Sequence, residues 1–464
     1  MSKTIAPGKV GGLEKTGFLG FSCSTNIAYN FKSLYYLTFL TMVLHIPVLT
    51  ATVMLTIGTV WDAVNDPLIA LFCANHSFKN GEKVRPYALW CCVPWAATII
   101  LLFVNFHITQ SWTIVISVLI YFIFEALYTF LCMPYNTLAA LATKDDAERK
   151  SINAFRSLGS CIGSGIGSVA IVPMVKLFGG LQDHKIINES DSKALILTAV
   201  SMGVICIAGS LFHYFTSKER VVSEPEEKTD KISLVTAYKM LFGCKSWILN
   251  MCYIICYGIT QALIMQNVNY YASFVLGSSG LATPILAGYL VVAIITSITA
   301  PMIDAKLGRK NTMLLAVAVI VIGKLPFIIA PETIVTVIIN AVTVGFGSTV
   351  AFIMFNTNRN NITDVVAAQN NRRIDTLIAG GDNLISKLAE AAAIQLMGVV
   401  LATVGFDSAA EVQNAASVTA IEAFLGWVPA VITLVEILFI LKLDIPGELK
   451  KAQEKKASAE LSGK

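Results

Sequence analysis

The chain has 464 residues, of which 55% are hydrophobic and 14% charged, and its formal net charge at pH 7 is +4. A soluble chain of this length would form two or three domains with water-facing surfaces, and this composition supplies too little charge to cover them. A net charge of +4 is also too small to indicate a nucleic-acid partner. The solvent that fits this composition is lipid.

Twelve long apolar segments follow one another along the chain. Their lengths suit membrane helices, which need roughly 20 residues to cross a bilayer. The polar N-terminus has no small-residue cleavage site behind a short apolar core, so we expect no removable signal peptide. The predicted helices are 17–43, 47–74, 86–106, 111–142, 150–178, 193–215, 246–276, 281–303, 310–329, 332–358, 372–403 and 415–442.

Lysine and arginine gather in the connections after the second, fourth, sixth, eighth and tenth segments and in the tail after the twelfth. The intervening connections carry none, except the one after the fifth segment, which contains Lys185. Because basic residues favour the cytoplasmic side, both termini are predicted to be cytoplasmic, in a multi-pass protein of the cell membrane. The basic-free connections are 44–46, 107–110, 277–280, 330–331 and 404–414.

The first helix places three polar side chains on one face: Asn26, Tyr29 and Lys32. Lys32 falls near mid-span, too deep for its amine to reach an interface. Such a lysine must pair with an acid or bind an anionic ligand. We predict that it pairs with Asp62 or Asp66 of the second helix.

The second helix contains two acids that are expensive in hydrocarbon. Asp62 and Asp66 are four residues apart, so they share one face, and Asn65 lies beside them. Two carboxylates roughly 5–6 Å apart on a helix face cannot both stay ionised in a poor solvent without a cation. Carboxylate and amide oxygens suit a hard ion, so the sequence predicts either a bound Na⁺ or a proton at this pair.

The fourth helix carries a stripe of polar residues, spaced by four, three and four: Glu125, Thr129, Cys132 and Asn136. The hydroxyl of Thr129 can contribute to the cation site. Glu125, one turn away, is either a group that binds substrate or a proton, or a structural acid bonded to water or backbone.

The fifth helix begins near Arg156 and continues with Gly159, Gly163 and Gly167, with serines between them. This small-xxx-small pattern predicts a close contact with another helix. In the eleventh helix, Lys387 and Glu390 are three residues apart and are predicted to neutralise one another.

A charged linker divides the segments into two sets of six. We therefore expect a cytoplasmic N-terminus (1–16), a first half (17–215), a cytoplasmic linker (216–245), a second half (246–442) and a cytoplasmic tail (443–464). This layout, with the Gly-Arg-Lys turn at residues 308–310, resembles the major facilitator superfamily, an all-α membrane fold with 12 transmembrane helices in two halves.

Within that superfamily the chain resembles the glycoside-pentoside-hexuronide cation symporters. The most specific match is the run WDAVNDPL at residues 61–68, and KVRP at 83–86 also agrees. The resemblance implies that Asp62, Asn65, Asp66 and Thr129 bind the coupling cation.

The positions that differ from the family are those that contact the sugar. The melibiose-binding branch uses acids where this chain has Asn26 and Cys132, an aromatic residue where it has Asn136, and a tryptophan where it has Phe352. A lost negative charge and a gained lysine would suit an anionic solute such as a hexuronate. The residues expected to bind substrate are Asn26, Lys32, Glu125, Cys132, Asn136, Arg156, Phe352 and Lys387.

The leading hypothesis is cation-coupled symport of a sugar, glycoside or related solute, driven by Na⁺ or H⁺ and without another cofactor. The alternative is a transporter-derived sensor or inactive relative in which Lys32 permanently neutralises the acid pair. An enzyme is not expected, because the chain has no hydrolase triad, zinc-protease motif or phosphate-binding loop. The expected partners are the solute, the monovalent cation and membrane lipid, with no obligate protein partner.

Overall fold

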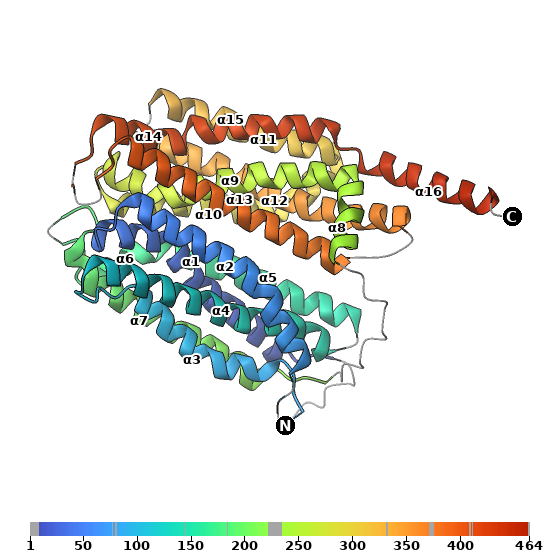
Figure 1. Ribbon diagram of the computed structural model, residues 1–464, viewed down its shortest axis with the longest axis horizontal. Helices are drawn as coiled ribbons and strands as arrows, with labels where there is room; N and C mark the ends of the chain where they lie inside the picture. The colour runs from blue at the N-terminus through green and yellow to red at the C-terminus, as the bar shows by residue number, and fades with distance from the viewer. Residues whose placement is uncertain are drawn as a thin grey trace. The chain divides into compact units, whose positions relative to one another are not determined.

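The computed structural model describes residues 9–76, 78, 81–143, 145–182, 184–220, 234–330, 333–370, 375–407, 410 and 412–462. Throughout these residues the chain forms helices joined by connections, and no strand occurs among them (Figure 1). The predicted all-α class is therefore confirmed for this part of the chain.

Among the described residues, the first half contains seven α-helices. Two of them, α5 and α6, are separated at Ala170 and bent by 50°, so the predicted segment 150–178 is a broken span. The elements are α1 (Gly12–Thr38), which continues into the π-helical turn η1 (Phe39–Val43), α2 (Val48–Asn75), α3 (Arg85–Leu102), α4 (Gln110–Ala142), α5 (Asp146–Val169), α6 (Ile171–Leu177), η2 (Glu189–Asp191) and α7 (Ser192–Thr216).

A short helix, α8, lies within the predicted linker and precedes the first long helix of the second half. In the last predicted span of the second half, the helix is interrupted at Gly426. The elements are α8 (Leu234–Gly243), α9 (Lys245–Phe274), η3 (Ser279–Leu281), α10 (Ala282–Leu307), α11 (Arg309–Ile329), α12 (Ile334–Asn370), α13 (Asp375–Thr403), α14 (Ala415–Leu425), α15 (Trp427–Lys442) and α16 (Ile445–Ser462).

In the described part of the chain, ten helices are long and apolar enough to cross a membrane, or eleven if α5 and α6 form one span. α1, which is rich in serine, asparagine and tyrosine, lies outside this set but occupies the first predicted segment. The helices thus agree with a multi-pass membrane protein and are consistent with twelve spans.

Helix α2 shows the burial pattern of a membrane helix. Its apolar residues Val64 and Leu68 are 53% and 61% exposed, whereas Asp62 and Asn65 are 8% and 5% exposed. In water this arrangement would be unfavourable, but in lipid the apolar face meets hydrocarbon and the polar face is sheltered by protein. The fold therefore turns the acid pair away from the surrounding solvent.

The glycines of α5 pack directly against α1. A Cβ atom added to Gly159, Gly163 or Gly167 would lie 2.3, 2.1 and 2.6 Å from the backbone oxygens of Leu19, Cys23 and Ile27. Only glycine permits this approach, so the predicted close helix contact is confirmed.

Replacing Gly163 with alanine is expected to destabilise the protein by about 1–3 kcal/mol, because the added methyl group forces the two backbones apart. Gly288 of α10 is the matched control, since its nearest neighbour would lie 3.8 Å from an added Cβ. Gly288→Ala should be neutral or stabilise by up to about 1 kcal/mol through helix propensity. Thermal unfolding of both purified variants measures the difference, and equal shifts would contradict this account of the contact.

The break between α14 and α15 is held by a buried lysine. Lys324 of α11 is 0% exposed, and its Nζ donates to the backbone oxygen of Leu425 at 2.8 Å and to Asn340 Oδ1 at 3.2 Å. Leu425 is the last residue of α14, where backbone carbonyls lack helical partners and the helix dipole is negative. Lys324 therefore caps this helix end.

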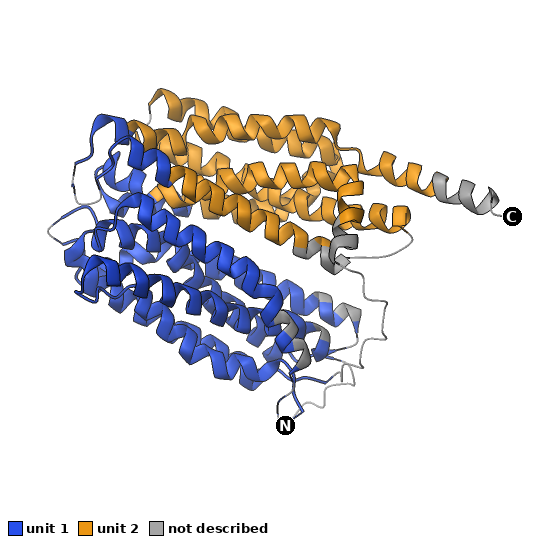
Figure 2. Ribbon diagram, in the orientation of Figure 1, with its two compact units in different colours: residues 1–226, 269–287, 398–418 blue, residues 227–268, 288–397, 419–464 orange. Residues whose placement is uncertain are grey.

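The chain separates into two compact units, coloured in Figure 2. Unit 1 comprises Met1–Glu226, Asn269–Ala287 and Gly398–Val418, and unit 2 comprises Glu227–Val268, Gly288–Met397 and Thr419–Lys464.

Unit 1 includes the last turns of α9, which bond to α1 and η1. Asn269 Nδ2 donates to the backbone oxygen of Leu34 at 2.5 Å, and the hydroxyls of Tyr270 and Thr41 are 2.7 Å apart. All four residues are buried, so these bonds are shielded from water.

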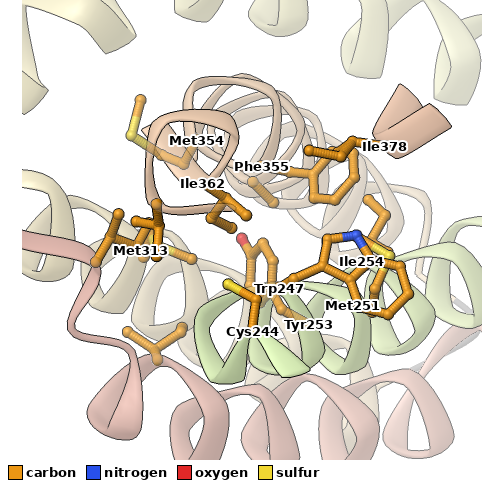
Figure 3. Packing of buried hydrophobic residues seen from close by; sticks show 14 of the residues in the cluster. Cys244, Trp247, Met251, Tyr253, Ile254, Met313, Met354, Phe355, Ile362 and Ile378 are labelled. Carbon is orange, nitrogen blue, oxygen red and sulfur yellow. The ribbon is translucent and has the colours of Figure 1, made fainter. Parts of the chain in front are cut away.

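Unit 2 has its own apolar core, in which aromatic and sulfur-containing side chains of α9 meet α11 and α12 (Figure 3). The indole of Trp247, buried in this core, donates to Asp382 Oδ1 at 3.1 Å. The bond satisfies the indole nitrogen, which would be costly to bury without an acceptor.

Candidate functional site

The acid pair of α2 is joined to α4 through a hydroxyl group. Thr129 Oγ1 lies 2.8 Å from Asp66 Oδ1 and 3.1 Å from the backbone oxygen of Glu125. Thr129 is buried, and Asp66 is half-buried. The structure thus brings the fourth predicted cation ligand to the second helix, where the other three lie.

Asn65 adds an unsatisfied polar atom to the same helix face. Its Nδ2 is buried and has no hydrogen-bond partner within the described residues. Rotation of the amide presents Oδ1 at that position instead, and amide, hydroxyl and carboxylate oxygens are the ligands that hard monovalent and divalent ions prefer. The donor set of Asp62, Asn65, Asp66 and Thr129 therefore fits a small cation.

Lys32 does not pair with the acid pair, and that prediction was wrong. Its Nζ lies 2.5 Å from Glu125 Oε1 and 3.1 Å from the hydroxyl of Tyr121. Lys32 and Glu125 are 6% and 2% exposed. The physical reason is the packing of α1 on α4, which places the lysine beside Glu125 and Tyr121, one turn apart on α4.

Aromatic rings complete the surroundings of the lysine. Lys32 Nζ lies 4.8, 4.5 and 5.3 Å from the ring centres of Tyr29, Tyr121 and Phe124. Ring faces attract a cation at these distances, so they help the carboxylate to offset the loss of hydration. Tyr121 is not among the predicted site residues, although its position four residues before Glu125 places both on one helix face.

Glu125 uses only one of its carboxylate oxygens. Oε1 accepts from Lys32, whereas Oε2 is buried and has no hydrogen-bond partner in the described part of the chain. An ionised carboxylate oxygen without a donor is costly in the interior of a protein. Glu125 is therefore an acceptor that is available to a further donor.

Two more predicted substrate residues meet at the Asn136 end of the polar stripe on α4. The Arg156 guanidinium donates to Asn136 Oδ1 and, at 3.0 Å, to Asn153 Oδ1, and it lies over the ring of Tyr135. Its Nε is buried and has no partner among the described residues. Arg156 is thus held in place by neutral groups and keeps a donor.

The other predicted residues of the first half are bonded locally. Asn26 Nδ2 donates to the backbone oxygen of Ser22 at 2.7 Å, and its Oδ1 lies 3.4 Å from Ser164 Oγ. Cys132 lies one turn after Tyr128 on α4. All ten predicted residues of α1, α2, α4 and α5 lie in unit 1.

Two predicted substrate residues belong to unit 2. Phe352 of α12 is 52% exposed, and its ring centre is 6.3 Å from that of Tyr257. Lys387 of α13 is half-buried.

A family model described as MFS/sugar transport protein matches residues 19–447. The isoprimeverose transporter of Lactiplantibacillus pentosus is 23% identical over 417 residues, which cover 89% of this chain and 84% of that protein. The inner membrane symporter YicJ of Escherichia coli is 23% identical, with 90% and 88% covered, and the putative glycoside/cation symporter YagG of the same species is 23% identical, with 81% and 79% covered.

Solved structures agree on the fold. A bacterial homologue of the human lysosomal transporter Spinster, inward-facing and unoccupied, aligns with a TM-score of 0.66 at 12% identity, covering 95% of this chain and 98% of that one. The nucleoside transporter NupG aligns with a TM-score of 0.62 at 12% identity, covering 93% and 100%. Together with the family match, these alignments confirm the predicted major facilitator fold.

Proposed function

Because the chain belongs to the MFS/sugar transport protein family, we propose that it is a secondary transporter that carries a sugar or glycoside together with a cation. The predicted resemblance to the glycoside-pentoside-hexuronide cation symporters is confirmed, and the protein is a transporter rather than an enzyme. The observation that carries the proposal is the contact of Thr129 with Asp66, because it assembles oxygen ligands from two helices beside a buried acid.

The cation binds to Asp62, Asn65, Asp66 and Thr129. Two carboxylates on one buried helix face repel each other, and a bound Na⁺ or a proton removes that repulsion. The solute therefore binds more tightly when the cation site holds Na⁺ or a proton than when that site is empty. Coupling of this kind is a difference in affinity between states, which allows a cation gradient to drive the solute.

The solute meets the polar groups of α1, α4 and α5 in unit 1. Arg156 Nε and Glu125 Oε2 supply a buried donor and a buried acceptor without other partners among the described residues. A sugar, which carries both donors and acceptors, can satisfy groups of either kind.

The second hypothesis, an inactive relative or sensor, required Lys32 to neutralise Asp62 or Asp66. Lys32 bonds to Glu125 instead, so the charge of the acid pair is not cancelled by this lysine. The geometry therefore favours active symport.

The proposed location is the cell membrane, with both termini in the cytoplasm. The basic residues that flank the spans support this orientation, including Arg85 and Arg149 on the side of the N-terminus. Lys15, near the start of α1, forms an ion pair with Glu148 at the start of α5, at 2.8 Å.

Ligand stabilisation of the purified protein tests the function. A panel of glycosides, pentosides and hexuronates is added with and without Na⁺ and over a range of pH. A solute at 100 times its Kd should raise the free energy of unfolding by about 2.7 kcal/mol. If Na⁺ is the coupling ion, stabilisation requires Na⁺; if the proton is, it requires low pH and is indifferent to Na⁺. Stabilisation that ignores both ions would contradict cation coupling.

A further inference from the structure

The charges that meet at the site in unit 1 are three negative and two positive. Asp62, Asp66 and Glu125 are acids, and Lys32 and Arg156 are bases. One bound monovalent cation makes this set neutral. A charged solute would then leave a net charge beside the buried Lys32–Glu125 pair, at a considerable cost.

Lys32 in particular has no charge to offer an anionic solute. Its ammonium already contacts a carboxylate oxygen at 2.5 Å, a tyrosine hydroxyl and three ring faces. To bind a hexuronate through Lys32, the solute would have to displace Glu125 and leave that acid buried and unpaired. The gained lysine therefore does not favour an anionic solute, because Glu125 already neutralises it.

Glu125 itself offers a group that an uncharged sugar needs. Its Oε2 is buried and has no donor among the described residues, while its side chain is fixed by the bond from Lys32 to Oε1. Hydrogen bonds to an ionised acceptor are about twice as strong as those between neutral groups. A hydroxyl group of a solute satisfies this oxygen, whereas a second carboxylate is repelled by it.

We propose that the Lys32–Glu125 pair is a charge filter: it makes the transporter select uncharged, polyhydroxylated solutes over uronates, with Glu125 Oε2 accepting a hydrogen bond from a solute hydroxyl. The proposal rests on the proposed function and adds the class of solute. It also gives Glu125, rather than Asn26 or Cys132, the role of the acidic sugar ligand.

Matched pairs of solutes test the filter. Methyl glucoside and methyl glucuronoside differ at one carbon, a CH₂OH group against a carboxylate, and methyl galactoside and methyl galacturonoside form a second pair. Binding of each to the purified full-length protein is measured by calorimetry, with Na⁺ at acidic and neutral pH. In at least one pair the neutral member should bind ten-fold or more tightly than the uronate. Tighter binding of the uronates would overturn the filter, and so would a panel in which no member binds.

The variant Glu125→Gln then changes the charge and keeps the shape. Its amide oxygen can still accept from Lys32, but the ammonium is no longer neutralised, so the preference for the neutral member should fall by ten-fold or more. In Lys32→Met/Glu125→Gln both charges are absent, and preference for the neutral member should return with weaker binding. Glu436→Gln, a change of a buried glutamate in unit 2, is the matched control and should leave the ratio unaltered.

An unchanged ratio in Glu125→Gln would overturn the inference. The outcome separates it from the proposed function: uronate binding that still depends on Na⁺ or on pH would refute the filter alone. Binding independent of both ions would refute cation coupling while leaving the measured ratio of neutral to anionic solute intact.

Discussion

Asp66→Asn is expected to abolish cation-dependent uptake while the folded protein remains in the membrane. Asparagine has nearly the same shape and can still accept the hydrogen bond from Thr129 Oγ1, which lies 2.8 Å from Asp66 Oδ1. What it lacks is the charge. Removing one member of a buried charge pair typically costs about 2–5 kcal/mol, so the affinity for the cation should fall by at least about 30-fold.

Uptake of radiolabelled solute into vesicles, with and without an imposed cation gradient, measures this loss. Glu189→Gln is the control, because Glu189 is an exposed acid of η2, with a side chain 58% exposed. That variant should transport like the unmodified protein. If Asp66→Asn retained uptake with the same ion dependence, Asp66 would not be a cation ligand.

Lys32→Met is expected to destabilise the protein more strongly than Lys15→Met, a change in the same helix. Methionine fills a similar volume but leaves the Glu125 carboxylate buried, 2% exposed, without its cation. Breaking a buried pair by removing one partner costs about 3–5 kcal/mol, since an uncompensated charge remains. The midpoint of thermal unfolding in detergent should therefore fall clearly.

Lys15→Met supplies the comparison within the same helix. Lys15 also pairs with a glutamate, at 2.8 Å, but both side chains are 16% exposed at the end of the span. Its loss should cost about 1 kcal/mol or less. The double variant Lys32→Met/Glu125→Gln should recover most of the stability, and a double variant as unstable as Lys32→Met would show that the pair is not the cause.

Sequence reasoning located the helices because the apolar segments are long and the connections are short and polar. The predicted bounds 47–74 and 193–215 differ from those of α2 and α7 by a residue at either end. It did not foresee the breaks at Ala170 and Gly426, because a bend needs only one or two residues of altered backbone and leaves the apolar pattern unchanged.

At the site, residue spacing predicted which side chains share a face of one helix, but it did not predict which side chains of different helices pair. The positions of Asp62, Asn65 and Asp66 on one face follow from helical geometry alone. Which acid faces Lys32 depends on how far α1 is rotated and shifted against α4, and several acids lay within reach of a flexible side chain. Among these acids Lys32 pairs with Glu125, at a buried position lined by aromatic side chains.

The glycine contact between α5 and α1 also has a consequence for motion. Backbones that touch through three glycines, one per turn, cannot slide past each other by less than a full turn without a clash. Helices α1 and α5 should therefore travel as one rigid body through the transport cycle, carrying Lys32 and Arg156 together. Any hinge must lie outside this pair, and backbone amides along it should exchange with deuterium more slowly than those at the breaks of α6 and α14.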